Sequence, residues 1–247
     1  HARQKTKSPS LTMQKPPDFS EDKASRSPKD SAEILLVNPY YSQREEDYVY
    51  YPQTVPIVLL YLAGYLKKFG LESHIREFGV FAPQEAFFDG KRLRFGITDE
   101  AIRDILREEK PRIIGIPSMY SFYYRDVNQI VKTIKAIIPD VKIVIGGNHA
   151  SVYWNSILKN SSVDVVVIGE GEETFLQLCS HLLEGKSIES VDGIAFRRPD
   201  GEVTRTPPRK FIEDLDSIPI PDTTRIDYRK YLGKGNPFSI RPPAAGI

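Results

Sequence analysis

The chain has 247 residues, of which 40% are hydrophobic and 27% are charged, which is typical of a globular protein with one core. Its formal net charge of +1 offers no electrostatic attraction for nucleic acid, so we expect no nucleic-acid partner. The longest apolar stretch, residues 55–66, is too short to cross a bilayer, and the amino-terminal segment lacks the apolar stretch of a secretory signal.

Cys179 is the only cysteine, which limits the redox chemistry of the chain. One thiol forms no internal disulfide, which fits a reducing compartment, and we expect a cytoplasmic protein. One thiol also cannot hold a cysteine-ligated iron–sulfur cluster, because such a cluster needs several thiolates. Cys179 lies in an apolar helical pattern, so we predict that it is a core residue.

Residues 1–31 are rich in Lys, Ser and Pro, and this composition predicts a disordered extension. From residue 32 onward, short β-branched runs alternate with helical patterns, which indicates βαβ units. The predicted strands are 34–37, 73–78, 112–116, 142–145 and 164–168. The predicted helices are 56–69, 99–109, 126–138, 152–159 and 172–183. The last three strands are nearly all apolar, so we predict an α/β fold with a doubly wound, five-stranded parallel sheet in the order 2-1-3-4-5.

The pattern changes after residue 188. Residues 194–197 and 202–206 flank the turn sequence RPDG, which predicts a β-hairpin. From Pro207 the chain has many prolines and no periodicity, which is typical of a linker. We therefore divide the chain into the extension (1–31), the α/β domain (32–188), and a hairpin with a linker (189–247) that leads toward a domain absent from this chain.

The candidate site follows from the fold, because ligands of open α/β sheets bind beyond the carboxyl ends of the strands. Small residues and backbone at these ends would leave a groove for an elongated polar ligand, with a planar cofactor across its top. The candidate residues are Asn38 and Pro39 after the first strand, Ser118, Met119 and Tyr120 after the third, Gly146, Gly147, Asn148 and His149 after the fourth, and Gly169, Glu170, Gly171, Glu172 and Thr174 after the fifth.

Each of these signals also has a structural explanation when it is taken alone. The glycine pair at 146–147 can be a tight strand exit, the segment 169–171 can be a turn, and His149 can be an ordinary hydrogen-bonded histidine. Glu170 lies between two glycines without helical neighbours, so we expect its carboxylate to point into the cleft. The prediction depends on all of them lying at one edge of one sheet.

Motifs for several other ligands are missing. Residues 38–41 read NPYY where a dinucleotide-binding domain has G-x-G-x-x-G, and the chain contains neither a P-loop nor a G-x-S-x-G nucleophile elbow. The loop after the first strand also lacks the Ser/Thr-rich phosphate loop of an FMN site. We predict no catalytic and no metal-ligating residue in this chain, which by itself is not expected to be catalytic.

Five segments resemble the B12-binding radical SAM enzymes. They are ILLVNP (34–39), LYLAGYL (60–66), RIIGI (112–116), KIVIGGNHAS (142–151) and VDVVVIGEGEETF (163–175). The similarity covers about residues 33–225, and the pair GG-x-HAS and GEGE-x-TF on consecutive strands is its most specific part. The chain resembles the N-terminal cobalamin-binding domain of that family.

This resemblance implies a Rossmann-like (flavodoxin-like) domain that holds cobalamin. It implies that Ser118, Gly146, Gly147 and His149 line the dimethylbenzimidazole tail, that residues 169–172 contact its nucleotide end or wall the groove, and that Asn38 and Pro39 underlie the corrin. It further implies a radical SAM domain in cis in the full-length protein. That domain would hold a 4Fe-4S cluster and S-adenosylmethionine, and the enzyme would be a candidate methyltransferase.

The chain departs from related patterns in two ways. It lacks the Cys-x-x-x-Cys-x-x-Cys motif of a radical SAM domain, so it resembles only the binding half. Cobalamin domains of the methionine-synthase type place a cobalt-binding histidine after the first strand, whereas residues 38–54 contain none. We therefore expect cobalamin to be bound base-off and without a histidine ligand.

Two other functions stay open at the level of sequence. The chain could be an interaction or regulatory module that kept this fold without a cofactor, or a small-molecule enzyme that uses the same cleft without cobalamin. The absorbance spectrum of the protein after reconstitution with hydroxocobalamin separates the first function from these two.

Overall fold

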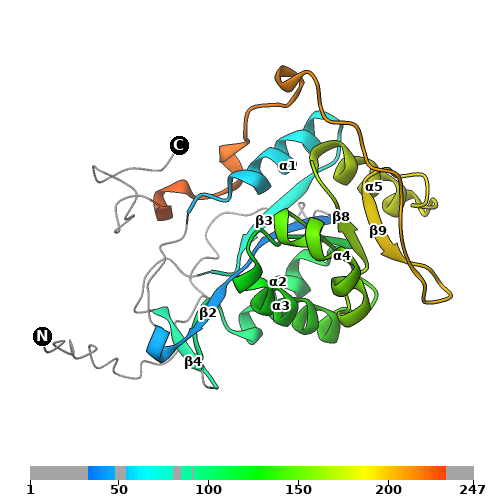
Figure 1. Cartoon of the computed structure of the whole chain (residues 1–247). Helices are drawn as coiled ribbons and strands as arrows, with labels where there is room; N and C mark the ends of the chain where they lie inside the picture. The colour runs from blue at the N-terminus through cyan, green and yellow to red at the C-terminus, as the bar shows by residue number, and fades with distance from the viewer. Residues whose placement is uncertain (1–32, 48–53, 80–84, 91, 232–247) are drawn as a thin grey trace, which may run out of the picture.

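The computed structural model describes residues 33–47, 54–79, 85–90 and 92–231, so the predicted disordered extension lies outside the described residues. Its centre is a seven-stranded sheet of order β10-β9-β8-β7-β6-β1-β3 (Figure 1). The parallel strands are β1 (Ile34–Asn38), β3 (Ser73–Glu77), β6 (Ile113–Pro117), β7 (Lys142–Gly146) and β8 (Val165–Val167). Taken along the chain, these strands have the order 2-1-3-4-5, which confirms the predicted topology, and each ends within one residue of its expected end.

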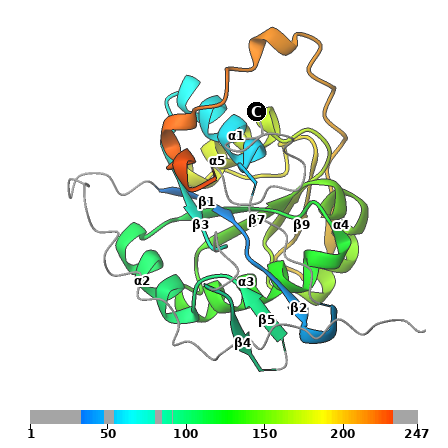
Figure 2. The ribbon, with the colours of Figure 1, turned by 90° about the vertical axis from the view of Figure 1, so that its left-hand side faces the viewer.

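Helices cover both faces of the sheet, because successive strand residues point to opposite faces. In β1, Leu35 and Val37 join one apolar cluster, whereas Ile34 and Leu36 join the other. The helices are α1 (Ile57–Lys68), α2 (Asp99–Glu109), α3 (Tyr124–Ile137), α4 (Asn148–Asn160) and α5 (Glu172–Glu184). Helices α1 and α5 pack on the face of Ile34, and α2, α3 and α4 pack on the opposite face (Figure 2).

Helix α4 begins at Asn148, whereas the sequence predicts its start near residue 152. The helix is kinked at Tyr153, whose φ of −105° and ψ of 17° are not helical. The segment before the kink is stabilised by the loop after β6, because the carbonyl oxygen of Ser118 accepts hydrogen bonds from the backbone N–H groups of His149 and Ala150. This contact comes from a distant part of the chain, so the local sequence does not reveal it.

A second sheet of three antiparallel strands was not predicted. It consists of β2 (Tyr41–Arg44), β5 (Arg92–Phe95) and β4 (Phe87–Asp89), in that order. The buried carboxylate of Asp126 in α3 holds this sheet against the domain, because it accepts hydrogen bonds from the backbone N–H of Ser42 at 2.7 Å and from the Ser42 hydroxyl at 2.6 Å. The second sheet thus lies beside the loop that follows β1.

The predicted hairpin is present as β9 (Ile194–Arg197) and β10 (Val203–Arg205). Strand β9 pairs antiparallel with β8, so the hairpin extends the central sheet instead of standing apart from it. Ile194 and Ala195 are fully buried, one in each apolar cluster. The main sheet therefore continues past residue 188 to Arg205. None of the helices in the described parts of the chain is long and apolar enough to span a membrane.

Candidate functional site

The exits of β6 and β7 are joined by backbone hydrogen bonds. The N–H of Ser118 donates to the carbonyl oxygen of Gly146 at 2.7 Å, and the N–H of His149 donates to the carbonyl oxygen of Ser118 at 3.1 Å. Ser118 is therefore a neighbour of Gly146 and His149 at the carboxyl edge of the sheet, although it lies 28 residues before Gly146 in the sequence. This juxtaposition is the one that the sequence predicted.

The backbone conformation of Gly147 and the atoms packed around it both require a glycine at this position. Its φ is +99°, a conformation that side chains rarely adopt. A Cβ atom at this position would lie 2.7 Å from Met119 Sδ and 2.9 Å from the carbonyl oxygen of Ser118. The close approach of these two strand exits thus depends on the missing side chain, whether or not a ligand is bound.

Gly146 has different surroundings from its neighbour. A Cβ atom at Gly146 would meet only Val167, at 3.6 Å from its Cβ and 3.8 Å from its carbonyl oxygen. At Gly169, which has a φ of +83°, no atom lies within 4 Å of such a Cβ. A Cβ atom at Gly146 would thus have only ordinary contacts, and the exposed Gly169 has open space beside its backbone.

Two buried polar atoms of this site have no hydrogen-bond partner among the described residues. They are Ser118 Oγ and His149 Nε2, and the two residues are 1% and 9% exposed. An unpartnered buried polar atom costs free energy, so such atoms call for a ligand or a water molecule. Both residues were selected from the sequence as site residues, and both present a free polar atom here.

The environment of His149 keeps its imidazole neutral. The ring lies between Tyr124 and Tyr153, with centroid distances of 4.6 Å and 4.8 Å, and burial lowers its pKa. Its Nδ1 lies 2.9 Å from Ser121 Oγ, which leaves Nε2 for another partner. A neutral imidazole fixed in this way offers one hydrogen-bonding atom to a polar ligand, as a donor or an acceptor according to the tautomer.

Glu170 and Thr174 lie differently from the other candidate residues. The Glu170 carboxylate accepts a hydrogen bond from the backbone N–H of Ile212 at 2.9 Å, so it is directed to the segment after the hairpin and not into the groove as expected. Thr174 is fully buried, and its hydroxyl oxygen accepts from Arg209 Nε at 2.8 Å and lies 3.3 Å from the carbonyl oxygen of Asp192. The hydroxyl of Thr174 is thus already used within the protein.

The segments after β7 and β8 contribute three further candidates with less constrained surroundings. Asn148 is exposed in the first turn of α4, and Gly171 and Glu172 are half-buried at the start of α5. A Cβ atom at Gly171 would lie 3.7 Å from Leu62 of α1, which places this turn against that helix. These residues border the exit of β8 without a contact that points to a role.

Asn38 at the end of β1 is held by a residue that the sequence analysis missed. Its Nδ2 donates to Glu77 Oε2 at 2.7 Å, and the hydroxyl of Tyr231 donates to the other oxygen of Glu77. Burial raises the pKa of Glu77 above the usual range, although both hydrogen bonds oppose this effect. The position of Glu77 at the end of a predicted strand was the signal that could have identified it from the sequence. Pro39, which follows Asn38, is half-buried.

Aromatic side chains form the rim next to Ser118. Tyr120 is 59% exposed and Phe122 is 67% exposed, and their rings stack at a centroid distance of 5.5 Å. Tyr123 contacts Phe122 at 4.1 Å. Tyr120 was among the predicted site residues, whereas Phe122 was not. The rim thus offers exposed apolar surface close to the free polar atoms.

A hollow elsewhere on the described chain does not involve the candidate residues. An open hollow of about 820 Å³ lies between α2 and α3, but none of the residues that line it is among the candidates. No group of three or more His, Cys, Asp and Glu side chains that could hold a metal ion occurs among the described residues. Cys179 is fully buried, as expected for a core residue, and burial raises the pKa of its thiol.

The arrangement fits an elongated polar cofactor. It combines two unpartnered polar atoms, a strand exit at Gly146 with room beside its backbone, and an exposed aromatic rim. The model of the B12 binding domain family matches residues 49–179 of the chain. The chain belongs to this family. It is a cobalamin-binding domain of the Rossmann-like type, as the sequence predicted.

Two curated relatives support this assignment. The chain is 30% identical over 223 residues to cytidylyl-2-hydroxyethylphosphonate methyltransferase of Streptomyces wedmorensis, which covers 81% of this chain and 41% of that protein. It is also 30% identical over 204 residues to anaerobic magnesium-protoporphyrin IX monomethyl ester cyclase of Rubrivivax gelatinosus, with coverages of 81% and 34%. The chain thus spans less than half the length of these relatives.

Solved structures show the same fold. The radical S-adenosylmethionine methyltransferase TsrM from Kitasatospora setae, with cobalamin and a [4Fe-4S] cluster bound, matches with a TM-score of 0.55 and 18% identity over 79% of this chain and 33% of that chain. The cobalamin-dependent S-adenosylmethionine radical enzyme OxsB with aqua-cobalamin matches with a TM-score of 0.58 and 20% identity, over 76% of this chain and 24% of that chain.

Proposed function

We propose that the domain holds the tail of cobalamin in the groove at the exits of β6, β7 and β8, and that it serves a radical SAM enzyme. The observation that carries this proposal is the pair of unpartnered buried atoms, Ser118 Oγ and His149 Nε2. They are the polar contacts of the tail in this proposal, and Gly146 and Gly147 border it. Cobalamin supplies a cobalt centre that can carry a methyl group.

The kind of enzyme to which this domain belongs is a proposal that rests on its relatives. The two curated relatives are named as a methyltransferase and a cyclase, and both solved relatives are radical S-adenosylmethionine enzymes. We propose that a radical SAM domain works in cis with this chain in the full-length protein. That domain would hold the 4Fe-4S cluster and S-adenosylmethionine, because the single buried Cys179 cannot hold a cluster. Methyl transfer is the reaction class that this setting favours.

The substitution Ser118→Ala tests the site. Loss of one hydrogen bond to the ligand should weaken retention of hydroxocobalamin about tenfold, since such a bond contributes on the order of 1 kcal/mol or somewhat more. Ser73→Ala is the matched control, because Ser73 Oγ is also buried and unpartnered among the described residues but lies at the start of β3. Cobalamin absorbance after gel filtration measures retention.

The outcomes of this experiment separate the candidate functions. Retention by the parent and the Ser73 control, with a loss in Ser118→Ala, supports the proposed site. Equal retention by Ser118→Ala and the parent would show that the tail lies elsewhere. No retention by the parent would favour an interaction module, or an enzyme that uses the cleft without cobalamin.

We also propose that cobalamin is bound base-off and without a histidine ligand. The structure describes three histidines. His74 pairs with Glu109 at 2.6 Å, and His181 contacts the carbonyl oxygen of Ser187 at 2.6 Å. His149 follows β7, where this proposal has the tail, and not β1. The described residues after β1, at positions 39–47 and 54, contain no histidine. Electron paramagnetic resonance of the cob(II)alamin form should therefore show no nitrogen superhyperfine splitting. Such a splitting would contradict this proposal.

A further inference from the structure

The segment after the hairpin follows a defined path over the domain. Residues 207–231, which we name the tether, have no strand or α-helix and form only short 3-10 turns. They lead from β10 at one edge of the sheet, past α5 and α1, to β3 at the opposite edge (Figures 1 and 2). The sequence predicted a linker here, but the structure fastens it to the domain in three places.

The first fastening holds the start of the tether on α5. Arg209 donates from Nε to the hydroxyl of Thr174 at 2.8 Å, contacts Glu173 at 3.3 Å and also donates to Gln177. Next to it, the backbone N–H of Ile212 donates to Glu170. Thr174 and Glu170 both belong to the segment that leaves β8, so the tether contacts the segment that borders the candidate site.

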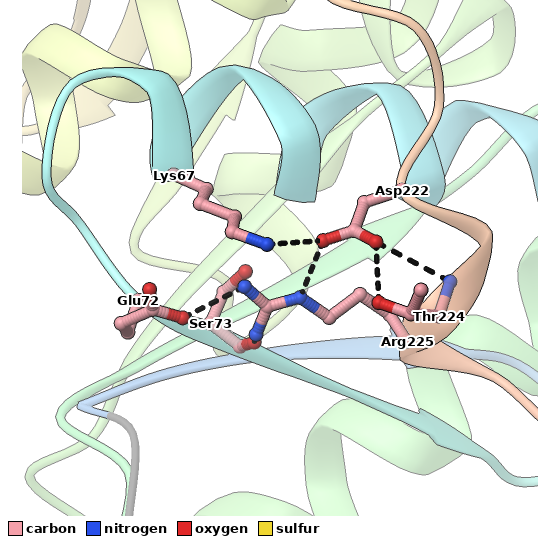
Figure 3. A network of polar contacts seen from close by, with 6 residues as sticks. All are labelled: Lys67, Glu72, Ser73, Asp222, Thr224 and Arg225. Carbon is pink, nitrogen blue, oxygen red and sulfur yellow. Dashed lines mark hydrogen bonds and ion pairs between the residues drawn. The ribbon is translucent and has the colours of Figure 1, made fainter.

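The second fastening centres on Asp222 and Arg225 (Figure 3). The Asp222 carboxylate lies 3.1 Å from Lys67 Nζ of α1 and 3.0 Å from Arg225 Nε. Arg225 in turn donates to the carbonyl oxygen of Ser73 at 2.9 Å and lies 2.7 Å from a carboxylate oxygen of Glu72. The side chains of Asp222 and Arg225 are only 13% and 15% exposed, so this central pair is better shielded from water than a surface ion pair, whereas Lys67 and Glu72 are 53% and 64% exposed.

Close packing against α1 supports the same fastening. A Cβ atom at Gly64 would lie 3.4 Å from the carbonyl oxygen of Ile220 and 3.7 Å from the backbone nitrogen of Asp222. The backbone nitrogen of Asp222 also donates to the carbonyl oxygen of Leu60 at 3.5 Å. The helix therefore presents its backbone, not a side chain, to the tether.

The third fastening holds the end of the tether on Glu77 of β3, next to the end of β1. The hydroxyl of Tyr231 donates to Glu77, and Glu77 accepts from Asn38. Tyr231 is only 9% exposed. Because Asn38 ends β1, this contact places the last described residue of the chain beside the carboxyl edge of the sheet.

We propose that the tether docks as one unit, and that its docking is coupled to the cofactor site through Glu170 and Thr174 at its start and Asn38 at its end. Asp222 and Arg225 are positioning residues, since they contact none of the candidate site residues themselves. Their role is to hold the middle of the tether so that both ends stay on the walls of the site. The coupling rests on the proposed function, whereas docking as one unit does not.

Hydrogen–deuterium exchange of the whole chain tests docking as one unit. In Arg225→Gln and in Asp222→Asn, amides across the tether should exchange about tenfold faster, because charge-assisted hydrogen bonds are lost. The decisive amide is Ile212, which is bonded to Glu170 far from the substituted residues. Arg198→Gln is the matched control, since Arg198 also pairs with two carboxylates but lies in the hairpin. Amides of β6 and β7 report whether the fold is intact.

Faster exchange at Ile212 in both variants, with β6 and β7 unchanged, supports a tether that docks as one unit. Faster exchange confined to residues 222–226 would overturn it. Hydroxocobalamin then tests the coupling in the parent, where exchange across the tether should slow about tenfold or more if the site and the tether stabilise each other. Retention of hydroxocobalamin without slower exchange would overturn the coupling. Failure of the parent to retain it would contradict the proposed function and leave the variant comparison decisive for docking.

Discussion

Gly146 and Gly147 follow one another at the end of β7, but their missing side chains have different consequences. A Cβ atom at Gly147 would press on Met119 and on the backbone of Ser118, and the residue has a positive φ. A Cβ atom at Gly146 would have ordinary contacts with Val167 and would otherwise project into free space. One glycine therefore serves the fold, and the other keeps space open.

This difference gives a prediction about two single substitutions. Gly147→Ala should destabilise the domain by roughly 1–3 kcal/mol, since it adds backbone strain and a close contact. Gly146→Ala should change the free energy of unfolding by less than about 1 kcal/mol, but it should weaken hydroxocobalamin retention by filling the groove. Urea unfolding and gel filtration measure the two effects. A Gly146→Ala protein that retains cobalamin like the parent would place the ligand away from β7.

At the scale of elements, the tether depends on charge and therefore on pH. The hydrogen bond from Thr224, together with contacts from Lys67 and Arg225, holds the pKa of Asp222 well below its usual range. A carboxyl whose pKa is lower in the folded state stabilises that state above its unfolded pKa. This contribution is lost as the pH falls from about 4 toward the folded pKa.

The comparison of the parent with Asp222→Asn isolates this contribution. At pH near neutrality the parent should have the larger free energy of unfolding in urea, because its Asp222 carboxylate is ionised whereas the asparagine amide of the variant carries no charge. Below about pH 4 the difference in the free energy of unfolding should shrink, since protonation makes the two side chains similar. A difference that is constant between neutral and acidic pH would show that the charge of Asp222 does not hold the tether.

Elements with a local pattern were predictable from the sequence. Helix α2 lies at the predicted residues because Thr98 caps it, with its hydroxyl oxygen 3.2 Å from the backbone nitrogen of Ala101. The small sheet of β2, β5 and β4 was missed, because strands of three or four residues carry little periodicity. Its anchor, Ser42 on Asp126, joins residues 84 positions apart, which no local pattern encodes.

Some residues of the candidate site could likewise be predicted from local sequence patterns, and others could not. Ser118, Gly146 and His149 could be predicted because each lies at the end of a strand or within three residues after it, and the topology of the sheet then brings them together. The direction of the Glu170 carboxylate could not, because it is set by Ile212, which lies 42 positions later. Glu77 was missed for a similar reason, since its contact with Tyr231 spans 154 positions.

At the scale of the whole molecule, the part of the chain that follows α5 extends one edge of the central sheet and contacts the other edge. The hairpin adds β9 and β10 beyond β8, and the tether then reaches the edge strand β3 on the far side. The five-stranded core that the sequence predicted is thus enclosed by about forty further residues, counted roughly from β9 to Tyr231. The hairpin and the tether thus both contact the central sheet.

The contact of Arg225 with Ser73 also bears on self-association. Edge strands expose unpaired backbone groups that can pair with a strand of another molecule. The carbonyl oxygen of Ser73 is such a group in β3, and the guanidinium of Arg225 occupies it at 2.9 Å. The same side chain that fastens the tether therefore makes this carbonyl group of the edge strand unavailable for pairing with a strand of another copy of the protein.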